Sequence, residues 1–238
     1  MKEVTPEADK RPRIPLSCRP MPAAKRTRRS TYHHGDLARA LAAAAVELAA
    51  EGEAFTLREV AAKVGVAHSA AYRHYPDKRA LLAAVAEEGF RELFAHVARR
   101  AVAAGDDARA RLSEIAMSYV DFALERPGHY AIMFGPRLNR DGRFPALETA
   151  ISEVAQLVAD EIKRGQAQGQ VRDGRARDIG LSLWVFAHGY VELVQHRRVK
   201  VKDRAVAADY FLALLEPLLD GLTLTGSRSA PPTRARRS

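Results

Sequence analysis

Apolar residues recur every three or four positions along most of the chain between residues 37 and 222. This spacing is typical of amphipathic α-helices, and no stretch alternates apolar and polar residues as a half-buried strand does. The pattern predicts helices at 37–51, 57–64, 68–74, 77–104, 112–122, 147–158, 179–194 and 203–222. A turn-rich stretch at 135–145 interrupts it. We therefore expect an all-α protein.

Two short predicted helices, at 57–64 and 68–74, are separated by a tight turn. Thr56 and Glu59 have the spacing of a capping box, which begins the first helix. Gly65 ends it, because the left-handed conformation costs glycine least. The second helix begins with small or short polar side chains, His68, Ser69 and Ala70, as a helix end that enters the major groove of DNA requires. With a helix before and a long one after, the pair predicts a helix–turn–helix within an N-terminal three-helix unit.

Positive charge is concentrated at the two ends of the chain. Residues 1–35 contain nine lysines and arginines against three acidic residues, and residues 226–238 contain four arginines and no acidic residue. The prolines in both segments oppose helix formation, so we expect a disordered basic arm at 1–30 and a disordered basic tail at 224–238. Such arms suit a polyanion, either nucleic acid or an anionic membrane surface, but they also serve simply as solubilising tails.

The helix–turn–helix segment closely resembles the DNA-binding domain of TetR-family transcriptional regulators, over about residues 31–91. The spacing of Gly65, Tyr72, His74 and Lys78 carries the resemblance. It implies that Arg58, His68 and Ser69 face base edges or nearby phosphates, and that Tyr72, His74 and Lys78 hold the DNA backbone. With their neighbours in the motif, the candidate DNA-binding residues are Thr56, Arg58, Ala67, His68, Ser69, Ala70, Tyr72, Arg73, His74 and Lys78. One position departs from the family, which often has Ser at the N-cap of the recognition helix, where this chain has Ala67. The alternative interpretation is that the short helices only pack against the rest of the protein and do not bind DNA.

The last two predicted helices contain more apolar residues than one helix face can hold. The segment 179–194 is apolar almost all round, with His188 and Glu192 as its only ionisable residues, and 203–222 is similarly rich in leucine. A helix of this kind is buried on more than one side. Two such helices from each of two chains would form an intermolecular four-helix bundle, which the family resemblance also implies. A monomeric core that contains both helices is the alternative.

Trp184, His188 and Gly189 form a Trp-x-x-x-His-Gly pattern that resembles a ligand-binding subtype of the same family. Trp184 and His188 share a helix face, and Gly189 permits the close approach of another helix. We therefore expect a C-terminal ligand-binding and dimerisation domain at 92–223. Its candidate pocket residues are Tyr119, Phe122, Tyr130, Met133, Phe134, Trp184 and His188. The simpler interpretation is a hydrogen-bonded core histidine beside a packed tryptophan.

Motifs for other kinds of chemistry are missing from the sequence. We find no nucleophile elbow, no phosphate-binding glycine loop and no zinc-protease motif, so we expect no catalytic residues, metal or cofactor. The single cysteine, Cys18, excludes an intramolecular disulfide, and the apolar run at 179–191 is too short to span a membrane.

The resemblance implies a ligand-responsive transcriptional regulator, most simply a repressor. It would bind a pseudopalindromic operator in double-stranded DNA as a homodimer and be released by a small-molecule effector. We expect it in the cytoplasm, associated with the bacterial nucleoid and not with a membrane. A basic-tailed helical interaction protein and a helical enzyme without a recognisable motif are the rival classes.

Overall fold

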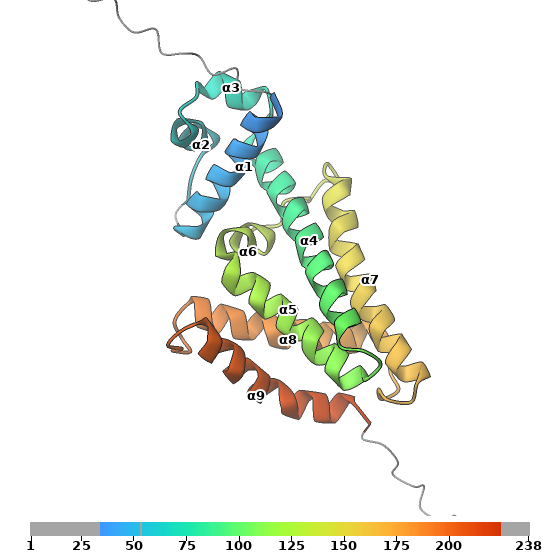
Figure 1. Ribbon diagram of the computed structural model, residues 1–238. Helices are drawn as coiled ribbons and strands as arrows, with labels where there is room; N and C mark the ends of the chain where they lie inside the picture. Colours follow the sequence, from blue (N-terminus) through green and yellow to red (C-terminus); the bar gives the residue numbers. More distant parts are fainter. Residues whose placement is uncertain (1–33, 53, 225–238) are drawn as a thin grey trace, which may run out of the picture. The chain divides into compact units, whose positions relative to one another are not determined.

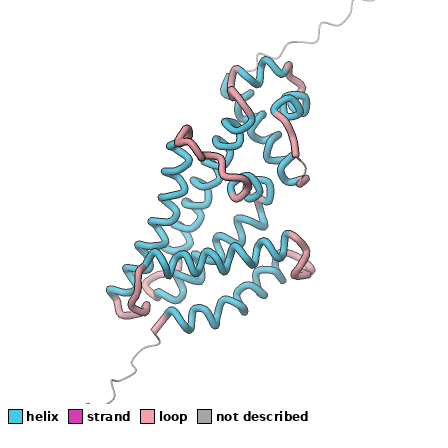
Figure 2. The backbone as a smooth tube through the Cα atoms, turned by 180° about the vertical axis from the view of Figure 1, so that it is seen from behind, coloured by secondary structure: helices cyan, strands magenta, loops and turns pink. Residues whose placement is uncertain are grey.

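The protein is described here by a computed structural model, which describes residues 34–52 and 54–224. Over these residues the chain forms nine α-helices and no β-sheet, so the expected all-α class is confirmed (Figures 1 and 2). The helices are α1 (His34–Ala50), α2 (Leu57–Val64), α3 (His68–Tyr72), α4 (Lys78–Ala103), α5 (Ala108–Glu125), α6 (Pro127–Met133), α7 (Pro145–Ala167), α8 (Ala176–Gln195) and α9 (Arg204–Leu222). The predicted basic arm at 1–30 lies outside the described residues, as does the tail at 224–238 apart from Leu224.

Local signals in the sequence set most helix ends in the N-terminal part. Thr56 and Glu59 form the predicted capping box, and Gly65 ends α2 in the left-handed conformation with φ 77°. Asp77 caps α4 by accepting a hydrogen bond from the Ala80 N–H at 2.7 Å. The predicted end of the second short helix was wrong: α3 stops at Tyr72, and His74 lies in the turn that follows. The C-terminal helices α5 and α7 are longer than the predicted 112–122 and 147–158.

Helix α4 continues without a break across the domain boundary expected at residues 91 and 92. Its first turns pack with α1, and its later turns pack with α5, α6 and α7. Leu81, Val85, Leu93 and Val97 are all buried along this one helix. A single rigid element therefore belongs both to the helix–turn–helix unit and to the C-terminal helices (Figure 1).

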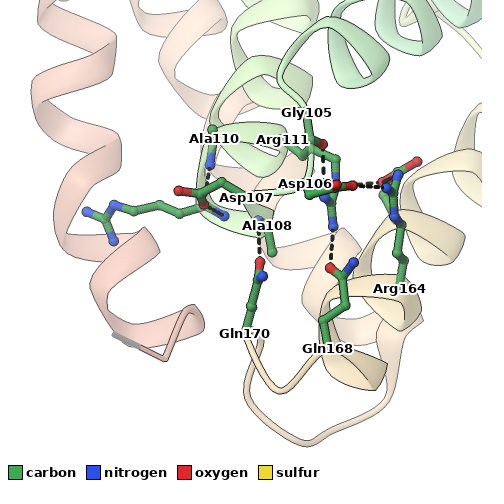
Figure 3. Close-up of polar contacts among 11 residues, drawn as sticks. Gly105, Asp106, Asp107, Ala108, Ala110, Arg111, Arg164, Gln168 and Gln170 are labelled. Carbon is green, nitrogen blue, oxygen red and sulfur yellow. Dashed lines mark hydrogen bonds and ion pairs between the residues drawn. The ribbon is translucent and has the colours of Figure 1, made fainter. Parts of the chain in front are cut away.

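Helix α5 lies at the centre of the C-terminal helices, in contact with α4, α6, α7, α8 and α9. The buried guanidinium of Arg111 holds its first turns in place (Figure 3). Arg111 donates to the Gly105 carbonyl at 3.1 Å and to Gln168 Oε1 at 3.1 Å, and it pairs with Glu161 at 2.9 Å. Because a buried charge is costly unless it is paired, these contacts fix the α4–α5 turn against the end of α7.

Helix α6 was not predicted, because its seven residues are too few to show a helical period. It packs between α1 and α4, and glycine makes both contacts possible. A Cβ atom on Gly128 would lie 2.2 Å from the Val46 carbonyl oxygen of α1. On the other side, a Cβ atom on Gly89 of α4 would lie 2.5 Å from Met133 Sδ.

We predict that Gly128→Ala lowers the free energy of unfolding by about 2 kcal/mol, because the new methyl group meets main chain that cannot move aside. The measurement is thermal or denaturant unfolding followed by circular dichroism. Gly221→Ala in α9 is the matched control: a Cβ atom there meets nothing within 4 Å, so a change within about 1 kcal/mol and on the stabilising side is expected. Equal effects of the two substitutions would contradict the close packing of α6 on α1.

Candidate DNA-binding surface and ligand cavity

The entry to α2 is held by two residues that bond each other. Thr56 Oγ1 accepts from the Glu59 N–H at 3.2 Å, and Glu59 Oε2 accepts from the Thr56 N–H at 2.6 Å. The hydrogen bonds from the Thr56 backbone and hydroxyl hold the pKa of the Glu59 carboxyl below its usual value. Thr56, predicted as a DNA-binding residue, therefore also sets the start of the helix that supports the recognition helix.

Four of the predicted DNA-binding residues form the exposed face of α3 and its end: His68, Ser69, Tyr72 and Arg73. The Tyr72 side chain is 50% exposed, which is unusual for a large aromatic residue. Its ring contacts the His68 ring nearly at right angles, with 6.4 Å between ring centroids. A row of exposed imidazole, hydroxyl, phenol and guanidinium groups on one short helix provides donors and acceptors for base edges and phosphates.

The remaining residues of the motif differ in their surroundings. Ala70 is buried with 8% exposure, unlike its neighbours His68 and Ser69, and its contact with DNA stays a prediction. Ala67 is exposed and precedes α3 without a side-chain cap, as its methyl group dictates. Arg58 is exposed on α2, and His74 is half-buried.

Lys78 has an intramolecular partner that the sequence did not reveal. Its ammonium group donates a hydrogen bond to the Phe55 carbonyl and lies 4.2 Å from the centroid of the Phe55 ring. These contacts join the start of α4 to the segment before α2. Contact of the same ammonium with DNA stays a prediction.

A segment between α6 and α7 is tied to the start of α4 by two ion pairs. Arg143 lies 2.7 Å from Asp77, the residue that caps α4, and Arg79 lies 2.7 Å from Asp141. The backbone N–H of Ala80 and then the Arg143 guanidinium lower the pKa of the Asp77 carboxyl. Both arginines also lie over the Phe144 ring, 5.2 Å and 5.4 Å from its centroid. The segment between α6 and α7 thus contacts α4, the helix that follows α3.

A cavity of about 470 Å³ lies among α4, α5, α6, α7 and α8. Of the predicted pocket residues, Tyr119, Met133, Phe134 and Trp184 line it. The other lining residues are Phe90, Leu93, Val97, Ile115, Ala116, Ile151, Val154, Ala155, Val158, Ala159, Ala176, Arg177, Gly180, Leu181, Leu183 and Ala187. The helical period of α7 made Ile151, Val154 and Val158 visible as apolar positions, but nothing in the sequence indicated which cavity they would face. The volume and apolar lining are typical of a small-molecule site.

Three predicted pocket residues do not line this cavity. Phe122 is buried in the core. Tyr130 and His188 form a polar cluster next to the cavity, in which the hydroxyls of Tyr119 and Tyr130 lie 2.7 Å and 2.9 Å from His188 Nδ1. Tyr130 also donates to Glu192 Oε1 at 2.9 Å. The histidine is therefore hydrogen-bonded by its neighbours, which agrees with the simpler of the two interpretations for His188.

Burial raises the pKa of the Tyr119 and Tyr130 phenols well above the usual value, and nearby Glu192 adds to the rise. Both phenols consequently stay neutral at physiological pH. On the side of the cavity nearest Glu192, the cluster of Tyr119, Tyr130 and His188 therefore presents neutral hydroxyl groups. Sequence reasoning missed Glu192, although its i+4 spacing from His188 on one helix was a usable signal.

Apolar side chains remain exposed on α8 and α9. They include Leu181, Val185, Leu193, Val206, Tyr210 and Leu214, with exposures from 39% to 56%. Helix α8 buries only one of its faces within the chain, through Ile179, Leu183 and Val191 among others. Nothing in the described chain lies within 4 Å of a Cβ atom on Gly189, so the expected close approach of a helix there does not occur within one chain. Exposed apolar area of this extent marks an interaction surface.

Two other kinds of site were searched for within residues 34–52 and 54–224. No group of three or more histidine, cysteine, aspartate or glutamate side chains there could hold a metal ion. In the same residues no helix combines the length and apolar character needed to cross a membrane.

An all-α chain with an exposed recognition helix and a separate apolar cavity defines the helix–turn–helix class of DNA-binding regulators. Two family models agree: "Bacterial regulatory proteins, tetR family" matches residues 40–85, and "Tetracyclin repressor-like, C-terminal domain" matches residues 112–218. The chain belongs to the TetR family of bacterial transcription regulators, as the resemblance predicted.

Individual proteins are similar to the chain in fold or in part of the sequence. A protein of unknown function from Rhodococcus sp. RHA1 is 30% identical, with a TM-score of 0.69 over 82% of this chain and 100% of its own. The ketosteroid transcriptional regulator KstR2 of Mycobacterium tuberculosis shares the fold, with 20% identity and a TM-score of 0.61 over 81% of this chain and 95% of its own. The nucleoid occlusion factor SlmA of Marinobacter nauticus is 27% identical over 123 residues, which span 52% of this chain and 62% of that relative.

We predict that Lys78→Met destabilises the protein by about 1–2 kcal/mol in the absence of DNA, because it removes a charged hydrogen bond and a cation–π contact. Arg73→Gln, at an exposed position, should change stability by less than about 0.5 kcal/mol. Urea unfolding of the two variants measures the difference. If Lys78→Met unfolds like the wild type, the contact with Phe55 contributes nothing to the fold.

Proposed function

We propose that this protein is a ligand-responsive transcriptional repressor that binds a pseudopalindromic operator as a homodimer. The observation that carries the proposal is the exposed face of α3, on which His68, Ser69 and Tyr72 are accessible. In a helix–turn–helix dimer, two recognition helices enter successive major grooves about one helical turn of DNA apart. Since the DNA is chromosomal, we place the protein in the cytoplasm, with the bacterial nucleoid.

The apolar surface of α8 and α9 supports the homodimer. Val185, Tyr210 and Leu214 stand among the exposed large side chains of these two helices. The same helices from a second chain would cover them as an isologous four-helix bundle. A self-complementary contact of this kind gives the two recognition helices the two-fold symmetry that a pseudopalindrome requires.

Three structural connections support coupling between the cavity and the DNA-binding surface: two helices and one ion pair. Helix α4 carries Phe90, Leu93 and Val97 in the cavity wall, and it begins directly after the helix–turn–helix. Helix α6 places Met133 in the wall, with Phe134 directly after it, and packs Gly128 on α1. The ion pair between Arg143 and Asp77 adds a third connection. A ligand that binds better to one placement of α4 and α6 would shift the population away from the DNA-binding form.

We do not propose for this chain the role in nucleoid occlusion after which the Marinobacter relative is named. The match to that protein spans 62% of its length. No contact in the described chain favours that role over operator binding.

We predict that His68→Ala and Tyr72→Ala each weaken binding to the operator at least tenfold, because each removes groups that face the groove or its phosphates. Stability should change by less than about 0.5 kcal/mol, since both side chains are exposed. The operator is first selected from fragments of the source genome, and affinity is then measured by fluorescence anisotropy at fixed salt.

Glu153→Ala, an exposed change on α7 far along the chain from α3, serves as the control and should bind DNA as the wild type does. Wild-type affinity in both α3 variants would overturn the proposal. A loss that is equal for operator and unrelated DNA would favour a basic-tailed interaction protein instead.

We also predict that Val185→Glu dissociates the dimer, because it places a charge in the apolar contact between α8 helices. Sedimentation equilibrium should show a monomer, and operator affinity should fall by at least tenfold, since one half-site remains per molecule. Val102→Glu in α4 is the matched control: Val102 is 77% exposed outside the α8–α9 surface, so this variant should stay dimeric. A dimeric Val185→Glu variant would exclude this surface as the interface.

A further inference from the structure

One ionised side chain lines the cavity, and it stands at one end. Arg177 is the only lysine, arginine, aspartate or glutamate among the lining residues. Its side chain makes no hydrogen bond or ion pair with any residue of the described part of the chain, although most arginines of the C-terminal helices are paired. A free guanidinium at an apolar cavity is a binding group for an anion.

The backbone at the same end of the cavity also favours negative charge. Ala176, Arg177 and Gly180 line the cavity from the first turns of α8, a helix of 20 residues. The residue before this helix, Arg175, supplies no side-chain cap, so the positive end of the helix dipole is not neutralised by a capping side chain. Asp178 lies in this turn, but its carboxylate pairs with Arg175 at 3.5 Å, and it does not line the cavity.

The aromatic part of the cavity has the opposite character. Phe134 and Trp184 line it beside Tyr119, whose hydroxyl is engaged with His188, and the Glu192 carboxylate stands behind this cluster. A negative charge placed there would be repelled by Glu192. Arg177 and Trp184 are seven residues apart on α8, which separates them by about 10 Å along the helix axis.

We propose that the effector is an amphipathic monoanion: a carboxylate that pairs with Arg177, joined to an apolar body that extends toward Trp184. This inference deepens the proposed function, because it rests on the cavity being the effector site. At about 30 Å³ for each water-sized group, the cavity holds on the order of fifteen such groups. A single guanidinium pairs with one carboxylate. A neutral amphiphile would leave Arg177 without an ionic partner, and a cationic amphiphile would be repelled by it.

The chain contains one tryptophan, Trp184, so its fluorescence reports occupancy of the cavity without any assay of DNA binding. Dodecanoate, dodecanol and dodecyltrimethylammonium, each below its micelle concentration, are titrated against the wild-type protein. We expect dodecanoate to bind most tightly. Arg177→Gln should weaken dodecanoate about two- to fivefold and leave dodecanol unchanged, because one ion pair at an exposed side chain is lost.

Two matched variants locate the effect. Arg172→Gln removes the same charge from an exposed side chain that does not line the cavity and leaves the Arg175–Asp178 pair intact, so this variant should bind dodecanoate as the wild type does. Ala159→Phe fills the cavity from α7 and should abolish the fluorescence change for all three probes. If Ala159→Phe responds as the wild type does, the probe sits on the exposed surface of α8 and α9 and the proposal is wrong.

The remaining outcomes separate this inference from the proposed function. Equal affinity for the three probes, no binding of any of them, or an Arg177→Gln variant that keeps its preference for dodecanoate would overturn the proposal. Selective binding of dodecanoate that releases the operator supports both. Selective binding without release supports the ligand class and contradicts the regulatory role of the cavity, whereas loss of operator binding in His68→Ala concerns the DNA-binding surface alone.

Discussion

The arrangement of the DNA-binding helices depends on one steric constraint, the contact of Gly128 with the main chain of Val46. At Gly128 there is no room for a side chain, because a Cβ atom would meet the Val46 carbonyl group and its side chain. On its opposite side α6 packs the Met133 side chain against Gly89 of α4, where a Cβ atom would lie 2.5 Å from the Met133 Sδ atom. Because packed interiors deform little, a displacement of α6 must be passed to α1, to α4 or to both. The same short helix ends with Met133 in the cavity wall, and Phe134 follows it there, so the constraint connects the cavity wall with the helices of the DNA-binding unit.

Electrostatic contacts add to the steric contacts of α6: they hold the start of α4 and make the two ends of the cavity chemically different. The start of α4 is held by Asp77, and Arg143 reaches that carboxylate from the segment before α7. The cavity itself is nearly free of charge, with neutral phenols on the side of Glu192 and a guanidinium at the first turn of α8. An asymmetric cavity orients an asymmetric ligand, and an oriented ligand places its bulk against chosen helices. The coupling that we propose therefore needs neither a metal nor a charged relay through the core.

Local signals in the sequence were sufficient for most of the fold. The capping box at Thr56, the left-handed turn at Gly65 and the cap at Asp77 each act within a few residues, and each appears as expected. Helix α6 was missed because seven residues show no period, and the end of α3 was placed two residues too late. The burial of Ala70 was not visible in the sequence, because an alanine carries no signal that distinguishes a buried helix position from an exposed one.

The sequence by itself determined the helical class, the helix–turn–helix and the family, because these depend on period, caps and the spacing of a few residues along one segment. It also showed that α8 and α9 hold more apolar surface than one face needs. Only the tertiary structure decided which aromatic residues line the cavity, that Lys78 contacts Phe55, and that Arg177 at the cavity's end has no partner among residues 34–52 and 54–224. Those facts depend on contacts between segments that are distant in the chain, and neither period nor local spacing contains that information.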